Sequence, residues 1–578
     1  MAQQDPVGVK PTPLRQKIAA LAVGLLLLLA GGIVTCLMRP DSVGALLGRV
    51  GSVAGPASSE RAFNESYLDA LAGKDTTQRT SCVGCHSSAN DLVGPAASVL
   101  DSRSKLSRAA WARAIPLAAK CGICHVVPDP AHLPRQSWSE AIARMEDIME
   151  IRNTTKPTAV ELQDVLHFYL TFSRENQPRL ADDPAPARSP SKFEASVLGQ
   201  PVSTDPRERP VIGNVSLVDL DRDGRLKVLA CDTRNSAVTW LHNSSAGWTE
   251  VTLAKVPFPA RARVVTADAP ENLNLAVACL GAMGPTDAPV GSVVLLVNDG
   301  ARHFWAKTIL DGVGRVADVE PGDFDGDGDV DFVVAAYGFI NQGEVGWLEN
   351  SGGTTYAYHR IVKRTGAMNV PAIDLNDDWR LDFVALFAQE HEQISAFLND
   401  GQGGFREQVL FKAATPSFGS SGLELVDLDK DGDTDILYTN GDNMDLPTMI
   451  PRPYHGVQWL ENRGGLSFVW HDIHRCYGPY CAATGDLNND GHLDIVVTSM
   501  FNDWSDTKRA SLIWLENDGQ HRFTPRGIAR QPIHLLSAAV GDLDGDGWAD
   551  IAAGGMNGFP PFERMGRITL WKNRHTRR

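Results

Sequence analysis

The chain carries two copies of the pattern Cys-x-x-Cys-His, at 82–86 and 121–125. In this pattern each thiolate can form a thioether to a vinyl group of haem, and the adjacent histidine becomes an axial ligand of the iron. A zinc site leaves the repeated histidine unexplained, and no βαβ pattern supports a thioredoxin-like redox pair. We therefore expect two covalent c-type haems. The expected haem-binding residues are Cys82, Cys85, His86, Cys121, Cys124 and His125.

Each haem iron needs a sixth ligand or an open position. Met145 and Met149 lie four residues apart on one face of an expected helix, so either thioether is a candidate ligand opposite His125. The alternative is that one or both are core methionines.

The first haem has no nearby distal ligand, because no Met or His lies between His86 and Cys121. Its ligand must come from elsewhere, or the position is open. The candidates are His132, His167, the spare methionine, Lys74, Lys105 and Lys120. Such an asymmetry would give the two irons different potentials, since axial ligand and exposure set the potential.

An apolar stretch at 18–38 follows Lys10, Arg15 and Lys17. It is long enough to cross a bilayer once, and the positive-inside rule places residues 1–17 in the cytoplasm and the rest outside. A cleaved signal peptide is the alternative, although its apolar region is usually only about 7–15 residues long. Covalent haem attachment occurs outside the cytoplasm, so we expect a membrane-anchored chain with its bulk in the periplasm or another extracytoplasmic compartment.

The composition is that of a globular chain of 578 residues, 43% apolar and 21% charged. A net charge of −16 without a basic run argues against a nucleic-acid partner. Nine cysteines are too few for a disulfide scaffold, although Cys476 and Cys481 could close a small disulfide loop.

Residues 60–176 show helical patterns at 106–119, 137–150 and 159–172, with Ser137 and Glu140 forming an expected capping box. The stretch from Cys121 to Trp138, together with 166–170, resembles the dihaem cytochrome c type of module. That resemblance implies a small α-helical domain whose distal ligand comes from the helix after the tryptophan. This chain has methionine there, where histidine is often found.

Residues 39–59 are expected to link the membrane span to the helical domain. A second linker, Pro-rich and polar, follows the helical domain at 177–192. From 193 to 578 a unit of about 50–58 residues repeats, which is typical of repeat architectures. Its clearest part is an acidic loop, Asp-x-Asp-x-Asp-Gly-x-x-Asp or a relative of it. The loops start at Asp219, near Asp268, and at Asp323, Asp374, Asp427, Asp486 and Asp542.

A corner such as Trp-Leu-Glu-Asn follows each loop, and after six corners comes one more strand pattern. The seventh corner, at Asn573, has no chain left for this strand, but a matching pattern lies upstream at 193–198. An N-terminal strand that completes the last blade closes a ring and removes its exposed edges. We therefore predict a mainly β fold, a seven-bladed β-propeller at 193–578. The repeats resemble the FG-GAP or VCBS class.

The acidic loops are also candidate calcium sites, because oxygens at positions 1, 3, 5 and 9 and a backbone carbonyl at position 7 can surround a hard cation. The alternative is that the carboxylates only cap turns. Four Ca²⁺ ions would offset about half of the net charge of −16. The expected calcium-site residues are Asp323, Asp325, Asp327, Asp329 and Asp331; Asp427, Asp429, Asp431, Asp433 and Asp435; Asp486, Asn488, Asp490, His492 and Asp494; and Asp542, Asp544, Asp546, Trp548 and Asp550.

Two further loops depart from the pattern. The Asp374 loop has Trp379 where glycine belongs, which predicts a weaker site. The Asp219 loop ends in Lys227 rather than aspartate, which predicts poor binding or none.

These features favour a membrane-anchored dihaem cytochrome that transfers electrons, with the propeller as a docking platform for a redox partner or a respiratory or photosynthetic complex. One alternative is an oxidoreductase with a substrate site on the propeller, although no catalytic residue or cofactor motif stands out there. Another is an adhesion or scaffold protein, which leaves the haems without a purpose.

Overall fold

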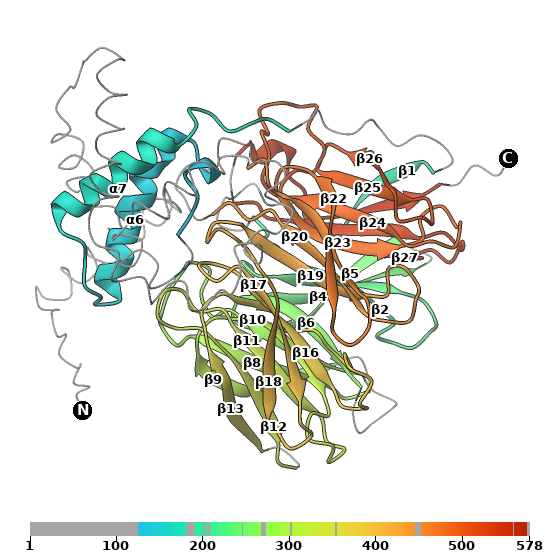
Figure 1. Cartoon of the computed structure of the whole chain (residues 1–578). Coiled ribbons are helices and arrows are strands. Elements are labelled where there is room, and N and C mark those ends of the chain that lie inside the picture. The colour runs from blue at the N-terminus through green and yellow to red at the C-terminus, as the bar shows by residue number, and fades with distance from the viewer. Residues whose placement is uncertain are drawn as a thin grey trace, which may run out of the picture. The chain divides into compact units, whose positions relative to one another are not determined.

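The computed structural model describes a helical segment and a β-propeller (Figure 1). The described residues are 125, 127–180, 191–199, 203, 205, 209–244, 247–266, 273–300, 303–352, 355–444, 452–558 and 560–574. All of them belong to one compact unit, Ser52–Arg578. The expected membrane span, the helix expected at 106–119, the first haem motif and both cysteines of the second lie outside them. Within the described ranges no helix is long and apolar enough to cross a membrane.

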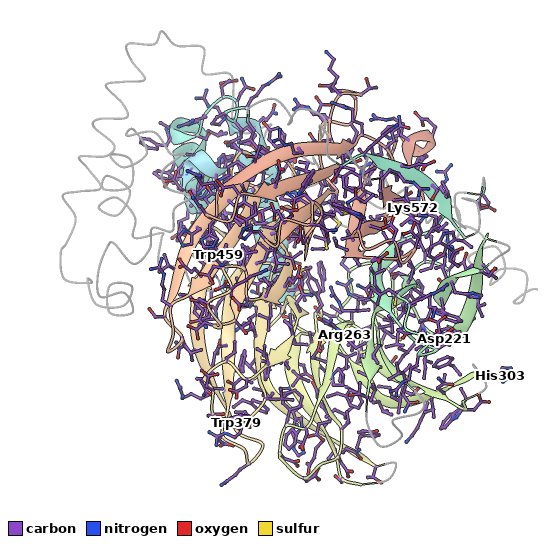
Figure 2. All side chains as sticks on the ribbon, turned by 90° about the vertical axis from the view of Figure 1, so that its right-hand side faces the viewer. Asp221, Arg263, His303, Trp379, Trp459 and Lys572 are labelled. Carbon is purple, nitrogen blue, oxygen red and sulfur yellow. The ribbon has the colours of Figure 1, made fainter. Side chains whose placement is uncertain are left out.

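Seven antiparallel sheets form the blades of the predicted propeller. The innermost strand of each blade contacts that of the next, and the strand of blade 1 also contacts that of blade 7. Figure 2 shows the blades surrounding the region of Arg263. The prediction of a seven-bladed ring is therefore confirmed.

Blades 1 to 4 run from the innermost to the outermost strand in chain order. Blade 1 contains β2 (Ile212–Val218), β3 (Lys227–Asp232), β4 (Ala237–Ser244) and β5 (Gly247–Lys255). Blade 2 contains β6 (Pro259–Val265), β7 (Asn274–Cys279), β8 (Gly291–Asn298) and β9 (Phe304–Val313). Blade 3 contains β10 (Val316–Gly322), β11 (Asp331–Ala336), β12 (Glu344–Asn350) and β13 (Tyr356–Lys363). Blade 4 contains β14 (Ala367–Asn369), β15 (Ala372–Ile373), β16 (Asp382–Phe387), β17 (Gln393–Asn399) and β18 (Phe405–Lys412).

Blades 5 and 6 repeat this order, and blade 7 takes its outermost strand from the start of the propeller. Blade 5 contains β19 (Ser420–Val426), β20 (Asp435–Asn440), β21 (Gly456–Asn462) and β22 (Phe468–Arg475). Blade 6 contains β23 (Pro479–Gly485), β24 (Asp494–Ser499), β25 (Leu512–Asn517) and β26 (Phe523–Ala529). Blade 7 contains β27 (Leu535–Gly541), β28 (Asp550–Gly555), β29 (Ile568–Asn573) and β1 (Phe193–Leu198), with a short 3₁₀ turn, η4 (Phe562–Arg564), before β29.

The ring closes through β1, as the displaced strand pattern predicts. β1 pairs antiparallel with β29, and the pairing runs from Phe193 opposite Asn573 to Leu198 opposite Ile568. Leu198 is buried between blades 7 and 1. The closing strand therefore covers the edge that β29 would otherwise expose.

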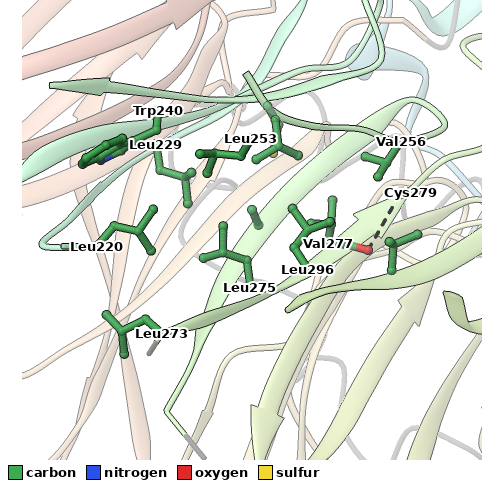
Figure 3. Packing of buried hydrophobic residues seen from close by; sticks show 14 residues of the cluster. Leu220, Leu229, Trp240, Leu253, Val256, Leu273, Leu275, Val277, Cys279 and Leu296 are labelled. Carbon is green, nitrogen blue, oxygen red and sulfur yellow. Dashed lines mark hydrogen bonds between the residues drawn. The ribbon is translucent and has the colours of Figure 1, made fainter. Parts of the chain in front are cut away.

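The hydrophobic core lies between the blades. The second strand of six blades is buried at every position, because other blades cover both of its faces. Figure 3 shows the cluster between blades 1 and 2, in which Leu229 and Trp240 pack against Leu275 and Val277. Each blade therefore depends on its neighbours for burial.

The disulfide considered between Cys476 and Cys481 does not form. Cys476 packs into the cluster between blades 5 and 6. The Cys481 thiol donates to the carbonyl of Ala538, 3.8 Å away in blade 7. The two side chains are thus engaged with different blades.

The helical segment contains two helices, α6 (Trp138–Ile151) and α7 (Ala159–Phe172), after two short 3₁₀ turns, η2 (Pro130–His132) and η3 (Arg135–Ser137). The Trp138 and Tyr169 rings stack with their centroids 3.8 Å apart, which joins the two helices. The predicted capping box at Ser137 is wrong, because Ser137 ends the preceding turn in a helical backbone conformation and its side chain makes no cap bond. The capping box is instead on α7, between Thr158 and Glu161.

The helical segment contacts the propeller on one face. Arg152, at the end of α6, donates to the Ile340 carbonyl at 2.8 Å and pairs with Glu390. The Leu180 amide donates to the Tyr477 hydroxyl at 2.8 Å. Ile340 and Glu390 lie in loops between the second and third strands of blades 3 and 4, whereas the acidic loops join first and second strands. Because the strands are antiparallel, the acidic loops lie on the opposite face.

Candidate metal centres

The acidic loop of blade 3 wraps around its first aspartate. Gly326 donates its amide to one carboxylate oxygen of Asp323 at 2.7 Å, and Gly328 donates to the other at 3.1 Å. Asp325 and Asp331 each bring an oxygen within 4.8 Å of an Asp323 oxygen and of each other. Three carboxylates therefore converge at the place where a hard cation would bind.

The ninth residue of each full loop accepts hydrogen bonds both from its own loop and from the corner at the end of the third strand. Asp331 has no exposed surface and accepts hydrogen bonds from the amides of Phe324 at 3.2 Å and Asn350 at 2.7 Å. The equivalent residues, Asp382, Asp435, Asp494 and Asp550, make the same pair of bonds at 2.7–3.3 Å. This residue therefore has a structural role whether or not a metal is bound.

Burial raises the pKa of these carboxyls, although the backbone amides oppose the shift. The pKa is about 6 for Asp331, Asp435 and Asp550 and about 7 for Asp494. A divalent cation would reverse the effect, because it stabilises the ionised carboxylates. Burial of the ninth-position carboxyls thus disfavours their charged form in each of these loops.

The predicted residues converge in three of the four full loops. Asp427, Asp429 and Asp435 form one further cluster of three carboxylates, and Asp542, Asp544 and Asp550 form another. The blade 6 loop has the same wrap, with Gly491 donating to Asp486 at 2.8 Å, but its third position is the amide Asn488. It therefore offers one carboxylate fewer.

The fifth and seventh positions also behave alike in the four loops. The fifth-position carboxylate accepts the amide of the seventh residue at 2.8–3.0 Å. This bond involves the seventh residue's N–H; the role expected for its carbonyl as a cation ligand stays a prediction. The pairs are Asp327 with Asp329, Asp431 with Asp433, Asp490 with His492, and Asp546 with Trp548.

The blade 4 loop keeps the wrap but not the carboxylate cluster. Trp379 donates its amide to Asp374 at 2.7 Å, as a glycine does in the other loops, with φ at +67° and 96% of its surface exposed. The Arg380 guanidinium binds Asp378 at 2.5 Å. This ion pair engages the fifth-position carboxylate, and the third position is the amide Asn376, so the loop lacks the three-carboxylate cluster; the weaker site stays a prediction.

Lysines contact two of the acidic clusters. In blade 1, Lys227 contacts Asp219, Asp221 and Asp223. In blade 7, Lys572 contacts Asp544 at the equivalent of position 3. Asp221 and Lys572 are labelled in Figure 2.

The side chain of the corner asparagine joins adjacent blades at two places in the ring. The Asn399 side chain donates to the Phe324 carbonyl of the preceding blade at 2.7 Å, and Asn573 donates to Leu487 of its preceding blade at the same distance. The corner asparagine therefore joins adjacent blades at these two places, whereas Asn298, Asn462 and Asn517 donate to carbonyls of their own blade.

Only part of the expected haem site lies within the described residues. His125 is half-buried. Met145 and Met149 are also half-buried, whereas the buried residues of α6 are Trp138, Ala141 and Ile142. The methionines therefore lie at the margin of the helix core, where a thioether remains accessible to a group beside α6.

Two candidates for the first haem's distal ligand are also described. His132 is buried, with its ring edge-on to Tyr454 of blade 5 at 5.6 Å. His167 is exposed on α7. His132 thus lies in the contact between the helical segment and the propeller. A small pocket in the same contact is lined in part by Arg174, Gln177 and Phe418.

A charged cluster that no sequence motif predicted lies where the first strands of blades 2 and 3 meet. Arg263, labelled in Figure 2, binds Asp318 at 3.2 Å and Glu320 at 3.0 Å. Burial raises the pKa of Glu320 to about 7, while Arg263 and Arg261 outweigh burial at Asp318 and lower its pKa. Arg261 and Arg263 on β6, and Asp318 and Glu320 on β10, lie two residues apart and so share a face of their strands. The sequence does not show that these two strands are neighbours.

Comparisons with known proteins agree with the repeat assignment. The family described as FG-GAP-like repeat matches residues 374–438, from the acidic loop of blade 4 into the second strand of blade 5. The T-cell immunomodulatory protein homolog of Plasmodium falciparum is 29% identical over 230 residues, which are 34% of this chain. The match covers 31% of that relative's length, so the chain spans less than a third of it.

Among solved structures, the crystal structure of BBS1N in complex with ARL6DN, soaked with lead, matches with a TM-score of 0.40 and 12% identity. That match covers 68% of this chain and 98% of the other. Likeness at this level says nothing about function.

Proposed function

We propose that this chain is a membrane-anchored, extracytoplasmic dihaem c-type cytochrome whose calcium-stiffened propeller positions the haem-bearing segment and docks a redox partner. The observation that carries the proposal is the direct contact of the helical segment, which begins beside His125, with the propeller through Arg152 and Leu180. A haem attached at the second motif would thus belong to a segment held by the ring.

The donor set beside α6 supports haem binding. An imidazole and a thioether are an established axial pair of c-type cytochromes, and both candidate methionines are half-buried. When bound, the haems would supply reversible one-electron chemistry. The residues of this chain would anchor them through four thioethers, hold the irons through His86 and His125, and exclude water with the apolar side of α6.

The calcium part of the proposal rests on the converging carboxylates. Three loops each bring together three carboxylates whose buried ninth residue has a raised pKa. Calcium accepts such oxygen ligands and would neutralise the charge. Because these loops lie opposite the helical segment, calcium would stiffen the ring without competing with it.

The test is to purify the chain from membranes and measure haem by pyridine haemochrome and intact mass. We expect two haems per chain, and one after Cys121→Ser/Cys124→Ser. Co-purification with a redox complex and reduction by that complex support electron transfer. Absence of covalent haem would refute the proposal.

A second candidate is a recognition or adhesion protein without redox activity. The FG-GAP-like match favours it, because the matched residues 374–438 lie in the propeller. A haem-free chain that keeps its native partner would establish this second function. Haem reduction by a small substrate, with no protein partner, would instead indicate an oxidoreductase.

A further inference from the structure

The acidic loop of blade 1 has the shape of a cation site. Asp219 accepts the amides of Asp223 at 3.1 Å and Gly224 at 2.8 Å, which is the same wrap as in the other loops. Oxygens of Asp219, Asp221 and Asp223 lie within 4.8 Å of one another. The loop therefore concentrates three negative charges in one place.

A lysine replaces the ninth aspartate of this loop. Lys227 begins β3, as Asp331 begins β11 and Asp435 begins β20. Its side chain is 5% exposed, and its ammonium lies 3.4 Å from Asp219 and in closer contact with Asp221 and Asp223. The ammonium thus reaches all three carboxylates at once.

The electrostatics hold this lysine in its charged form. Burial alone would lower the pKa of Lys227, but the hydrogen bonds to Asp221 and Asp223 outweigh it, so the pKa is raised. The Lys227 contact in turn lowers the pKa of Asp223. Both partners therefore remain ionised at neutral pH.

A metal ion and this ammonium exclude each other. Calcium needs oxygen ligands at about 2.3–2.6 Å on all sides, and Lys227 already contacts those oxygens. Two cations sharing three carboxylates would also repel each other.

We propose that Lys227 is a tethered cation that takes the place of calcium in blade 1, and that Lys227→Asp opens a calcium site there. The comparison with blades 3 and 5 rests on the proposed calcium binding of their loops. Blade 1 contacts blade 7, the blade that closes the ring. The loop beside the closure would thus keep its shape when calcium is withdrawn.

The experiment counts calcium ions per chain by equilibrium dialysis and elemental analysis, in the full-length protein. Lys227→Asp is compared with Lys255→Asp, which makes the same charge change on β5, outside the acidic loops. We expect one additional ion in Lys227→Asp and none in Lys255→Asp. We also expect Asp221→Asn to bind as many ions as the wild type.

A folded Lys227→Asp variant with no additional ion would overturn the proposal, as would loss of an ion in Asp221→Asn. If Lys227→Asp does not fold, Lys227→Met serves instead, because it leaves the three carboxylates without their cation. Its melting temperature should rise more on calcium addition than that of the wild type, and an equal rise would overturn the proposal. These differences report on blade 1 even if the wild-type chain binds no calcium, a result that would refute only the role proposed for the other loops.

Discussion

Replacing Asp435 by asparagine should have opposite consequences with and without calcium. Asp435 is fully buried and accepts the amides of Leu428 at 3.0 Å and Asn462 at 2.7 Å. Asparagine has almost the same shape but no charge. The variant therefore distinguishes the contribution of the two hydrogen bonds that Asp435 accepts from the contribution of its negative charge.

Without calcium, burial raises the pKa of Asp435 from 3.8 to about 6. This corresponds to up to about 3 kcal/mol in favour of the neutral form. An amide nitrogen cannot accept a hydrogen bond, so the variant leaves one amide unpaired at a cost of about 1–3 kcal/mol. In EDTA at pH 8 its stability should thus lie between that of the wild type and about 2 kcal/mol above it.

With calcium the balance reverses, because the variant loses a charged ligand. A site held at about 100 times its Kd contributes about 2.7 kcal/mol to the free energy of unfolding. We expect Asp435→Asn to bind one calcium ion fewer than the wild type. The difference in free energy of unfolding, variant minus wild type, should therefore be about 2–3 kcal/mol lower in calcium than in EDTA.

The pH dependence follows from the same shift. A carboxyl with a raised pKa contributes stability that is fully present below its unfolded pKa and is lost as the pH rises through its folded pKa. In EDTA the wild type should therefore lose stability from pH 4 through pH 6, and Asp435→Asn should lose less.

Urea unfolding at fixed pH, in EDTA and in calcium, measures these effects. Asp382→Asn is the matched control, because Asp382 makes the same two bonds, at 3.1 and 2.8 Å, in a loop whose Asp378 is paired with Arg380. Its calcium-dependent loss should be smaller. An equal loss for Asp435→Asn in EDTA and in calcium would refute the electrostatic argument.

Trp379→Gly should raise the free energy of unfolding in urea by about 0.5–1 kcal/mol, since it removes a bulky residue at φ +67°; a loss would show that the exposed ring is stabilising. Lys572→Glu should strengthen calcium binding in blade 7 about tenfold in a chelator competition, because it removes the ammonium from Asp544; unchanged affinity would contradict this. Glu320→Gln should flatten the fall in stability as the pH rises towards 7, the pKa of Glu320, at fixed calcium; an unaltered pH profile would exclude this carboxyl.

The ring could be predicted from the sequence because the repeats carry redundant local signals. The strand pattern at 193–198, ahead of the first blade, predicts the closure, which the β1–β29 pairing confirms. The prediction of weaker metal binding by the blade 4 loop depends on one residue, Trp379. The ion pair between Arg380 and Asp378 could not be predicted from the sequence and is seen only in the structure.

Other features depend on long-range geometry that no local pattern records. Arg263 and Asp318 are 55 residues apart. The ammonium of Lys227 contacts carboxylates of its own loop, and the residue type at position 227 does not by itself predict these contacts. The prediction of a capping box at Ser137 is wrong because Ser137 belongs to η3 and has a helical backbone conformation, whereas a capping residue is usually extended.

Because of the β1–β29 pairing, completion of the ring depends on both ends of the propeller sequence. Its partners are among the most distant in sequence, and the side-chain bond between Arg574 and Glu194 beside it spans 380 residues. A polypeptide shortened before β29 leaves β1 without a partner and blade 7 with a bare edge. Open β-edges favour aggregation, so we expect such a fragment to aggregate more readily than the whole chain. Blade 7 therefore cannot be completed until β29, the last of the described strands, has been synthesised.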